Sequence, residues 1–177
     1  MKTIYDVISD TYLDHLEKHI DLIQWYYHDK TASENDEETD NFSFSHLLFD
    51  GNELSSFYGM FTGLILECIS KCDIDLEEYY LKRARLGLIT KLPKQVIHRK
   101  HLDYYVDKEP EALGNIIILY YLNESDGDTY FYTDEGVITN RYKRNSLIYF
   151  DGLIEHSSSS PVNHNKRVAL NINLFRK

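Results

Sequence analysis

The amino-acid sequence predicts an α+β protein in which N-terminal helices pack on one sheet of a β-jelly roll. Apolar residues recur at a spacing of four near the start of the chain, which is typical of amphipathic helices. Later in the chain, short runs rich in Ile, Val, Tyr and Phe are separated by turn signals, which is typical of sandwiches, barrels and jelly rolls. Because the helices come first and the strands last, the sequence favours one mixed unit.

The length of 177 residues predicts one domain, which we place at residues 1–177. Residues 1–94 are expected to support a core formed by residues 95–177. The formal net charge of −10 disfavours a protein that grips nucleic-acid backbones. No apolar run approaches the ~18 residues that span a membrane, and Asp6 interrupts any signal-peptide-like start. We therefore expect a cytoplasmic protein with no membrane partner.

The first half of the chain is expected to hold two helices, at residues 4–20 and 55–71, each with one apolar face. Residues 29–40 contain six acidic side chains and predict a solvated loop, with a cation-binding or partner-binding loop as the alternative. Cys68 and Cys72 are expected to be reduced core residues, since a disulfide framework usually has more cysteines. The strands expected here are 22–28, 41–49 and 78–91.

The second half of the chain is expected to consist of short strands. Turn-forming pairs such as Asp126-Gly127 and Asp151-Gly152 separate the apolar runs. The charge also changes, from −14 over residues 1–80 to +4 over residues 81–177, which suggests different roles for the two parts. The expected strands are 95–104, 115–123, 128–133, 136–139, 146–150, 154–158 and 167–175.

The motif His101-Leu-Asp103 is the first indication of chemistry. Residues two apart in a strand face the same side, so this imidazole and carboxylate could converge on one ion. Two His and one carboxylate on one face leave three positions open, as in non-haem Fe(II) oxygenases, and His156 is a candidate for the second His. Because this spacing is common by chance, a purely structural histidine is the alternative. Arg167 begins the last strand, and its planar guanidinium suits the carboxylate of a small keto-diacid.

Five sequence blocks recur in a fixed order within residues 95–177. Together they resemble the 2-oxoglutarate- and Fe(II)-dependent dioxygenases, and within these the prolyl-4-hydroxylase-type branch. The chain looks especially similar to small single-domain members from bacteriophages and marine bacteria. The first part of the chain resembles the support region of the same proteins less distinctively. The blocks are His101-Leu-Asp103, residues 118–123, residues 127–131 with 147–150, His156, and residues 167–171.

The resemblance implies a double-stranded β-helix, which is a cupin-like jelly-roll core, with N-terminal supporting helices. It implies that His101, Asp103 and His156 are the catalytic residues and ligate Fe(II). It further implies 2-oxoglutarate as co-substrate, with ascorbate as a supporting reductant. Arg167 would bind the distal carboxylate of 2-oxoglutarate, and Tyr121 would assist it through its hydroxyl.

Other residues of the pocket follow from the same resemblance. Leu119 would line the cavity, and Asn171 would give a polar contact near the co-substrate. Many relatives carry Ser or Thr two residues after the arginine, whereas Ala169 has no hydroxyl, so the contacts of the distal carboxylate stay open. Arg83 and Arg85 share a strand face and could enter the cavity, with a surface position as the alternative.

The implied reaction is hydroxylation of a C–H bond in a protein or peptide side chain, with proline favoured, and with release of succinate and CO₂. The implied partners are 2-oxoglutarate, O₂ and a primary substrate of unknown identity. A small metabolite or free amino acid is the alternative substrate. A nucleic-acid dealkylase is less favoured, and a non-catalytic metal-binding jelly roll is the alternative of a different class. A phage-encoded member would act in the host cytoplasm, and the sequence does not indicate the oligomeric state.

Overall fold

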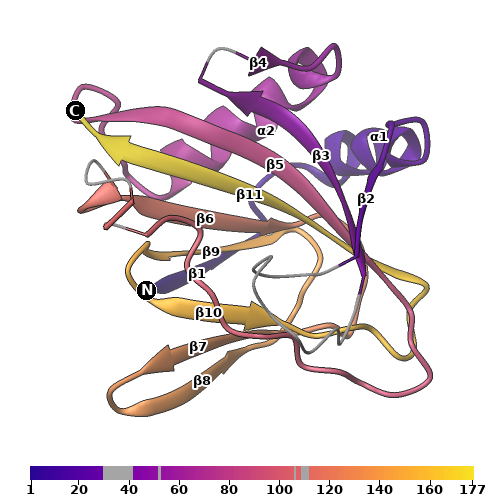
Figure 1. Ribbon diagram of the computed structural model, residues 1–177. Coiled ribbons are helices and arrows are strands. Elements are labelled where there is room, and N and C mark those ends of the chain that lie inside the picture. The colour runs from indigo at the N-terminus through magenta and orange to yellow at the C-terminus, as the bar shows by residue number, and fades with distance from the viewer. Residues whose placement is uncertain (30–41, 52, 106, 109–111) are drawn as a thin grey trace.

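The computed structural model describes residues 1–29, 42–51, 53–105, 107–108 and 112–177. Within these residues the chain forms two antiparallel sheets and two helices (Figure 1). The predicted class, an α+β protein with helices on one sheet of a jelly roll, is confirmed. Neither helix has the length and apolar character that crossing a membrane would require.

The larger sheet contains β1 (Lys2–Tyr5), β2 (Tyr26–His28), β3 (Ser43–Asp50), β4 (Glu53–Leu54), β5 (Tyr79–Thr90), β6 (Ile116–Tyr121), β9 (Ser146–Asp151) and β11 (Lys166–Arg176). Their order across the sheet is β1-β9-β6-β11-β5-β3-β2, and β4 pairs with β3. The last strand of the chain, β11, therefore lies near the centre of the sheet. There Ala169 is opposite Gly87 of β5 on one side and Tyr121 of β6 on the other.

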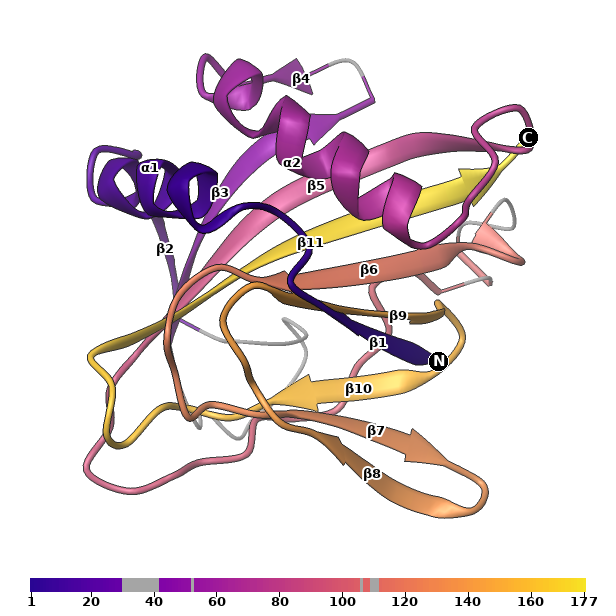
Figure 2. The ribbon, with the colours of Figure 1, turned by 180° about the vertical axis from the view of Figure 1, so that it is seen from behind.

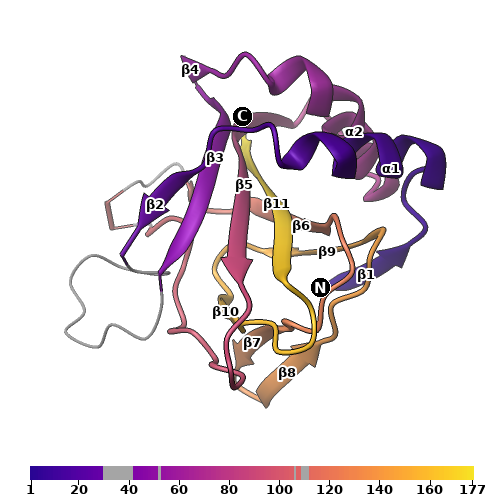
Figure 3. The same cartoon turned by 90° about the vertical axis from the view of Figure 1, so that its right-hand side faces the viewer.

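The smaller sheet contains β7 (Thr129–Thr133), β8 (Gly136–Asn140) and β10 (Glu155–Ser158), in the order β10-β7-β8. Figure 3 shows it below the large sheet, away from the two helices. An apolar cluster with Phe131 from the small sheet and Phe150 from the large sheet fills the space between them. The two sheets thus enclose a core of their own.

The two helices cover the opposite face of the large sheet, as Figure 2 shows from behind. They are α1 (Asp10–Ile20) and α2 (Tyr58–Lys71). The hydroxyl of Ser9 accepts a backbone N–H from the first turn of α1 and so caps its start. Leu13 and Leu64 are fully buried in the main core, which lies between the helices and the sheet.

The two-residue period of β11 separates these two cores. Val168 and Leu170 point to the helices and belong to the main core. Arg167, Ala169 and Asn171 point to the other face, where they line a cavity. A strand buried on both faces therefore carries apolar residues toward the helices and polar or small residues toward the cavity.

The N-terminal expectations were partly wrong. Residues 4–20 do not form one helix, because Lys2–Tyr5 pairs with β9 as an edge strand. Asp6 then adopts a φ of 53°, which interrupts the chain before the helix begins at Asp10. Within residues 22–28 only Tyr26–His28 is a strand.

The expected strand at residues 95–104 is also wrong. This segment makes two isolated bridges, Ile97 with Ser159 and His101 with His156. Its backbone hydrogen bonds to residues 156–160 are intermittent, so no continuous ladder forms. The other strands expected in the second half are present, with ends that differ by a few residues.

Three further expectations concern the two cysteines, the second helix and the acidic loop. Cys68 and Cys72 are free and buried, as expected. The helix expected at residues 55–71 is observed from Tyr58. The acidic loop expected at residues 29–40 lies almost entirely outside the described residues.

Two leucines of α2 offer a matched test of the helix-facing core. Leu64 is fully buried, whereas Leu66 is 52% exposed. We expect Leu64→Ala to lower the free energy of unfolding by about 2–5 kcal/mol, because it leaves a cavity between α2 and the sheet. Leu66→Ala should change it by less than about 0.5 kcal/mol. Urea denaturation checks both variants, and equal losses would contradict the assigned packing.

Candidate metal centre and adjoining cavity

Three side chains identified in the sequence lie together beside the small sheet. His156 belongs to β10, and His101 is bridged to it, since each donates its backbone N–H to the carbonyl of the other at 3.0 Å. Asp103 follows two residues after His101. The ligand atoms of these three residues all lie within 4.8 Å of one another. An antiparallel bridge, and not a regular strand, therefore brings the two histidines together.

Backbone carbonyls orient the two imidazoles. Nδ1 of His101 lies 3.4 Å from the carbonyl oxygen of Arg99, and Nδ1 of His156 lies 3.3 Å from that of Ile154. Because a carbonyl oxygen only accepts, each Nδ1 donates and each Nε2 keeps its lone pair for an ion. Burial, and then the neighbouring His156, lowers the pKa of His101 to about 4. His101 is therefore neutral at neutral pH, which is the form that binds a metal.

Two asparagines of β11 hold the buried carboxylate of Asp103. Its Oδ2 accepts from Nδ2 of Asn171 at 2.8 Å and from Nδ2 of Asn173 at 2.7 Å. Burial alone would raise the pKa of the Asp103 carboxyl, but the nearby imidazoles and Arg83 outweigh it and hold that pKa below its usual range. Oδ1 is left facing His101, whose Nε2 lies 3.8 Å away. The carboxylate is thus ionised, fixed and aimed at the histidines.

Arg167 is buried on the same face of β11. Its Nε donates to the carbonyl of Gly127 at 2.9 Å, and its Nη2 donates to Oγ1 of Thr129 at 3.0 Å. A Cβ at residue 127 would lie 2.9 Å from Cδ of Arg167 and 2.5 Å from the carbonyl of Ser159. Glycine is therefore required at this position for the arginine to take its place.

A chain of hydrogen bonds stands behind Thr129. Nδ2 of Asn140 donates to the Tyr121 hydroxyl at 2.9 Å, and that hydroxyl donates to Oγ1 of Thr129 at 2.8 Å. Oγ1 accepts from Arg167 as well, so both of its lone pairs are used and its own proton is free to donate. The expected link from Tyr121 to Arg167 thus runs through Thr129. No motif in the sequence marks Thr129 as a site residue.

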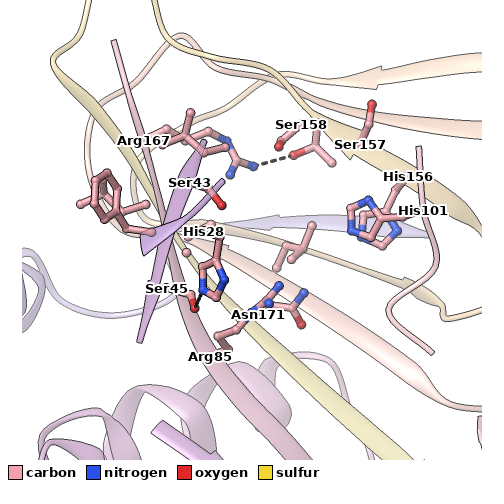
Figure 4. A pocket seen from close by; sticks show the side chains of 17 residues that line it. His28, Ser43, Ser45, Arg85, His101, His156, Ser157, Ser158, Arg167 and Asn171 are labelled. Carbon is pink, nitrogen blue, oxygen red and sulfur yellow. Dashed lines mark hydrogen bonds between the residues drawn. The ribbon is translucent and has the colours of Figure 1, made fainter. Parts of the chain in front are cut away.

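A cavity of about 180 Å³ joins the two histidines to Arg167. Figure 4 shows Arg167 at one side of this cavity and the imidazoles of His101 and His156 at the other. Leu119 and Asn171, both expected at the pocket, line it, whereas the Tyr121 side chain stands behind Thr129. No acidic side chain is among the described residues that line it.

The sequence left open whether Arg85 enters the cavity or lies on the surface. In the structure Arg85 lines the cavity. It lies opposite Asn171 in the pairing of β5 with β11. Arg83, two residues earlier on the same face, donates through Nε to Oδ1 of Asn173 at 3.0 Å. Arg83 and Arg85 are two residues apart in a predicted strand, which indicated that they share a face. Only the order of strands in the sheet shows that this face is the one toward the cavity.

No protein-family model matches the chain, and no curated protein matches it. Solved structures do match over nearly its whole length. A 2OG-Fe(II) oxygenase family oxidoreductase from Burkholderia pseudomallei superposes with a TM-score of 0.74 at 15% identity, over 99% of this chain and 85% of that one. The chain has the fold of the 2OG-Fe(II) oxygenases.

Two further structures agree on this oxygenase fold. A prolyl-4-hydroxylase from Pseudomonas putida has a TM-score of 0.60 at 16% identity, over 99% of this chain and 91% of that one. HygX from Streptomyces hygroscopicus, solved with nickel, 2-oxoglutarate and hygromycin B, has a TM-score of 0.65 at 8% identity, over 98% and 81% of the two chains. Since identities this low establish the fold, the chemistry of this chain is argued from its own residues.

The donor set in this oxygenase fold suits a divalent metal such as Fe(II). It offers two imidazole nitrogens and one carboxylate oxygen that lie within 4.8 Å of one another, and both histidines line the cavity. Mixed nitrogen and oxygen ligation from one face, with other positions open, is the ligand arrangement of non-haem Fe(II) sites. The asparagines and carbonyls behind these ligands are the supporting contacts that such a site requires.

Asn173 provides a test of this support. The substitution Asn173→Ala keeps all three candidate ligand residues, but it removes the hydrogen bond to Oδ2 of Asp103 and the acceptor for Nε of Arg83. We expect metal affinity to fall by about 10–100-fold, because the carboxylate loses its fixed orientation. Anaerobic Fe(II) titration, with Co(II) as a spectroscopic substitute, measures the change. The exposed Asn165→Ala is the matched control, and equal affinities in the two variants would contradict the assigned role.

His98, which is buried beside the metal centre, predicts a pH dependence of stability. Burial, followed by Arg167 and His101, lowers the pKa of His98 from 6.5 to about 4. The unfolded chain therefore binds a proton in this pH range while the folded chain does not, so stability falls as the pH drops. We expect the metal-free protein to lose about 1–2 kcal/mol per such histidine between about pH 7 and about pH 5. Urea unfolding at both pH values should show a smaller loss for His98→Gln, and identical losses would contradict the assignment.

Proposed function

We propose that this protein is a non-haem Fe(II)- and 2-oxoglutarate-dependent dioxygenase that hydroxylates a C–H bond of its primary substrate. One observation carries the proposal: His101 and His156, which cluster with Asp103, lie at one side of a cavity and the buried Arg167 lies at the other. In the overall reaction one atom of O₂ enters the new hydroxyl group and the other enters succinate, while 2-oxoglutarate loses one carbon as CO₂. A protein that only bound metal would have no need of the buried arginine.

Each residue of the cluster has a defined task in this proposal. His101, Asp103 and His156 hold Fe(II), which supplies the activation of O₂ together with bound 2-oxoglutarate. Asn171 and Asn173 fix the carboxylate of Asp103. The apolar wall, which includes Leu119, limits the access of water to the reacting carbon.

Arg167 and Thr129 form the anchor for the distal carboxylate of 2-oxoglutarate. Arg167 supplies the charge, and the free proton of Thr129 supplies a second donor. This donor takes the place of the hydroxyl that Ala169 lacks. Small residues at Gly87 and Ala169, opposite each other in neighbouring strands, leave room for the carbon chain.

The primary substrate belongs to one of two classes. The sequence resemblance favours a prolyl side chain of a protein or peptide, and the likeness to a prolyl-4-hydroxylase fold supports it. A small metabolite or free amino acid is the second class, and the cationic residues of the cavity support it. A single domain and a cytoplasmic location, which the free buried cysteines support, remain predictions. The relation to small oxygenases of bacteriophages and marine bacteria also remains a prediction.

Succinate release tests the proposed reaction. With Fe(II), ascorbate and 2-oxoglutarate under air, we expect slow succinate formation without primary substrate. His101→Ala should abolish it by removing a ligand, and Arg167→Ala should raise the KM for 2-oxoglutarate at least about 100-fold, because one buried charge pair is lost. The exposed Arg141→Ala is the control for loss of an arginine. Equal turnover in the wild type and both site variants would refute the enzyme assignment.

A further inference from the structure

Arg85 lies in the cavity but has no task in the chemistry described so far. It belongs to β5, where Asn171 of β11 and Leu47 of β3 are its neighbours across the sheet. Figure 4 shows the side chains of Arg85 and Asn171 next to each other, below Arg167 and to the left of the two imidazoles. This pair therefore lies beside the metal centre, at a place separate from the Arg167 anchor.

Both side chains of this pair have buried polar atoms without a partner. Nε of Arg85 is a buried donor with no hydrogen bond, and Oδ1 of Asn171 is a buried acceptor with none. Nδ2 of Asn171 is already bound to Asp103, which fixes the amide so that Oδ1 points away from that carboxylate. Buried polar groups are costly unless they are satisfied, so this adjacent donor and acceptor indicate a ligand that carries both complementary groups.

The charges around the cavity indicate the sign of the group that faces Arg85. Arg83 approaches Oδ2 of Asp103 at 3.7 Å. In the proposed reaction, the two carboxylates of 2-oxoglutarate are satisfied by Arg167 and by the metal. No acidic side chain is among the described lining residues, so Arg85 remains as an additional positive charge. Burial, and then the charge of Arg83, lowers the pKa of Arg85, while Asp103 acts in the opposite direction.

We propose that Arg85 and Asn171 bind the α-carboxylate and the α-ammonium group of a free amino acid, which is the primary substrate. This inference rests on the proposed function and selects between its two substrate classes. An α-amino acid presents an acceptor and a donor on one carbon atom, which matches one donor and one acceptor on adjacent strands. A guanidinium binds a carboxylate with two parallel hydrogen bonds. A prolyl residue inside a peptide has neither the free carboxylate nor the ammonium group.

The test compares free amino acids with analogues that lack the charge. The probes are each proteinogenic L-amino acid, its primary amide, and a proline-rich peptide blocked at both ends. Binding is measured by ligand-observed NMR on protein loaded with Zn(II) and 2-oxoglutarate, and stimulation of succinate release is measured with Fe(II). We expect at least one free amino acid to bind and stimulate, and its amide to bind at least about 10-fold more weakly, because an ionic hydrogen bond is lost.

Variants of Arg85 assign the contact. Arg85→Gln should raise the Kd of that amino acid at least about 30-fold while changing the KM for 2-oxoglutarate in uncoupled turnover less than about twofold. Arg85→Lys keeps the charge but loses the planar fork, so an intermediate loss is expected. The exposed Arg141→Gln is the control. Thermal unfolding verifies that each variant is folded, and the comparison of acid with amide on the wild type does not depend on any variant.

Two results would overturn the inference. In the first, no free amino acid binds, or the blocked peptide alone stimulates turnover. In the second, Arg85→Gln weakens 2-oxoglutarate about 10-fold or more and leaves amino-acid binding unchanged, which would assign Arg85 to the co-substrate. Failure of the proposed function looks different, because the wild type would then release no succinate and Arg167→Ala would not affect 2-oxoglutarate binding.

Discussion

The two-residue period of β11 is the constraint on which the rest of the structure depends. One face of this strand anchors the helices through residues such as Val168 and Leu170. On the other face, Arg167 and Asn171 line the cavity. Asn171 and Asn173 on that face donate hydrogen bonds to the carboxylate of Asp103. A shift of one residue in its register would exchange the two faces, burying charges under the helices and exposing apolar side chains to the cavity. Folding of the core and placement of the site are therefore one event.

Charge is distributed so that an acidic chain encloses a basic cavity. The net charge is −10, yet Arg85 and Arg167 line the cavity, and no described lining residue is acidic. The pKa of the Asp103 carboxyl lies below its usual range because the charges of its neighbours, Arg83 among them, outweigh the effect of burial. In a buried site each of these charges acts more strongly on a bound anion than it would in water. Asp103 and the two carboxylates of 2-oxoglutarate carry three negative charges against the four positive charges of Fe(II), Arg85 and Arg167, and the proposed α-carboxylate of an amino acid would face the remaining positive charge at Arg85.

The polar contacts around Arg167 join the two sheets. Ala169 has no hydroxyl, but Thr129 on the neighbouring small sheet provides one at the arginine. Its orientation follows from Tyr121 and Asn140, which donate in sequence toward it. The site thus draws on both sheets, and its geometry depends on the apolar core between them.

The sequence by itself determined the fold class, the two helices, most strands, and the residue types that could form a metal site. Those features follow from local periodicity and from motif spacing, which are written in short stretches of chain. It misplaced His101 in a strand and could not assign Thr129 or Arg85 a role. Only the tertiary structure placed these side chains, because their positions depend on contacts between distant segments: the bridge from His101 to His156 and the sheet order that brings β5 beside β11.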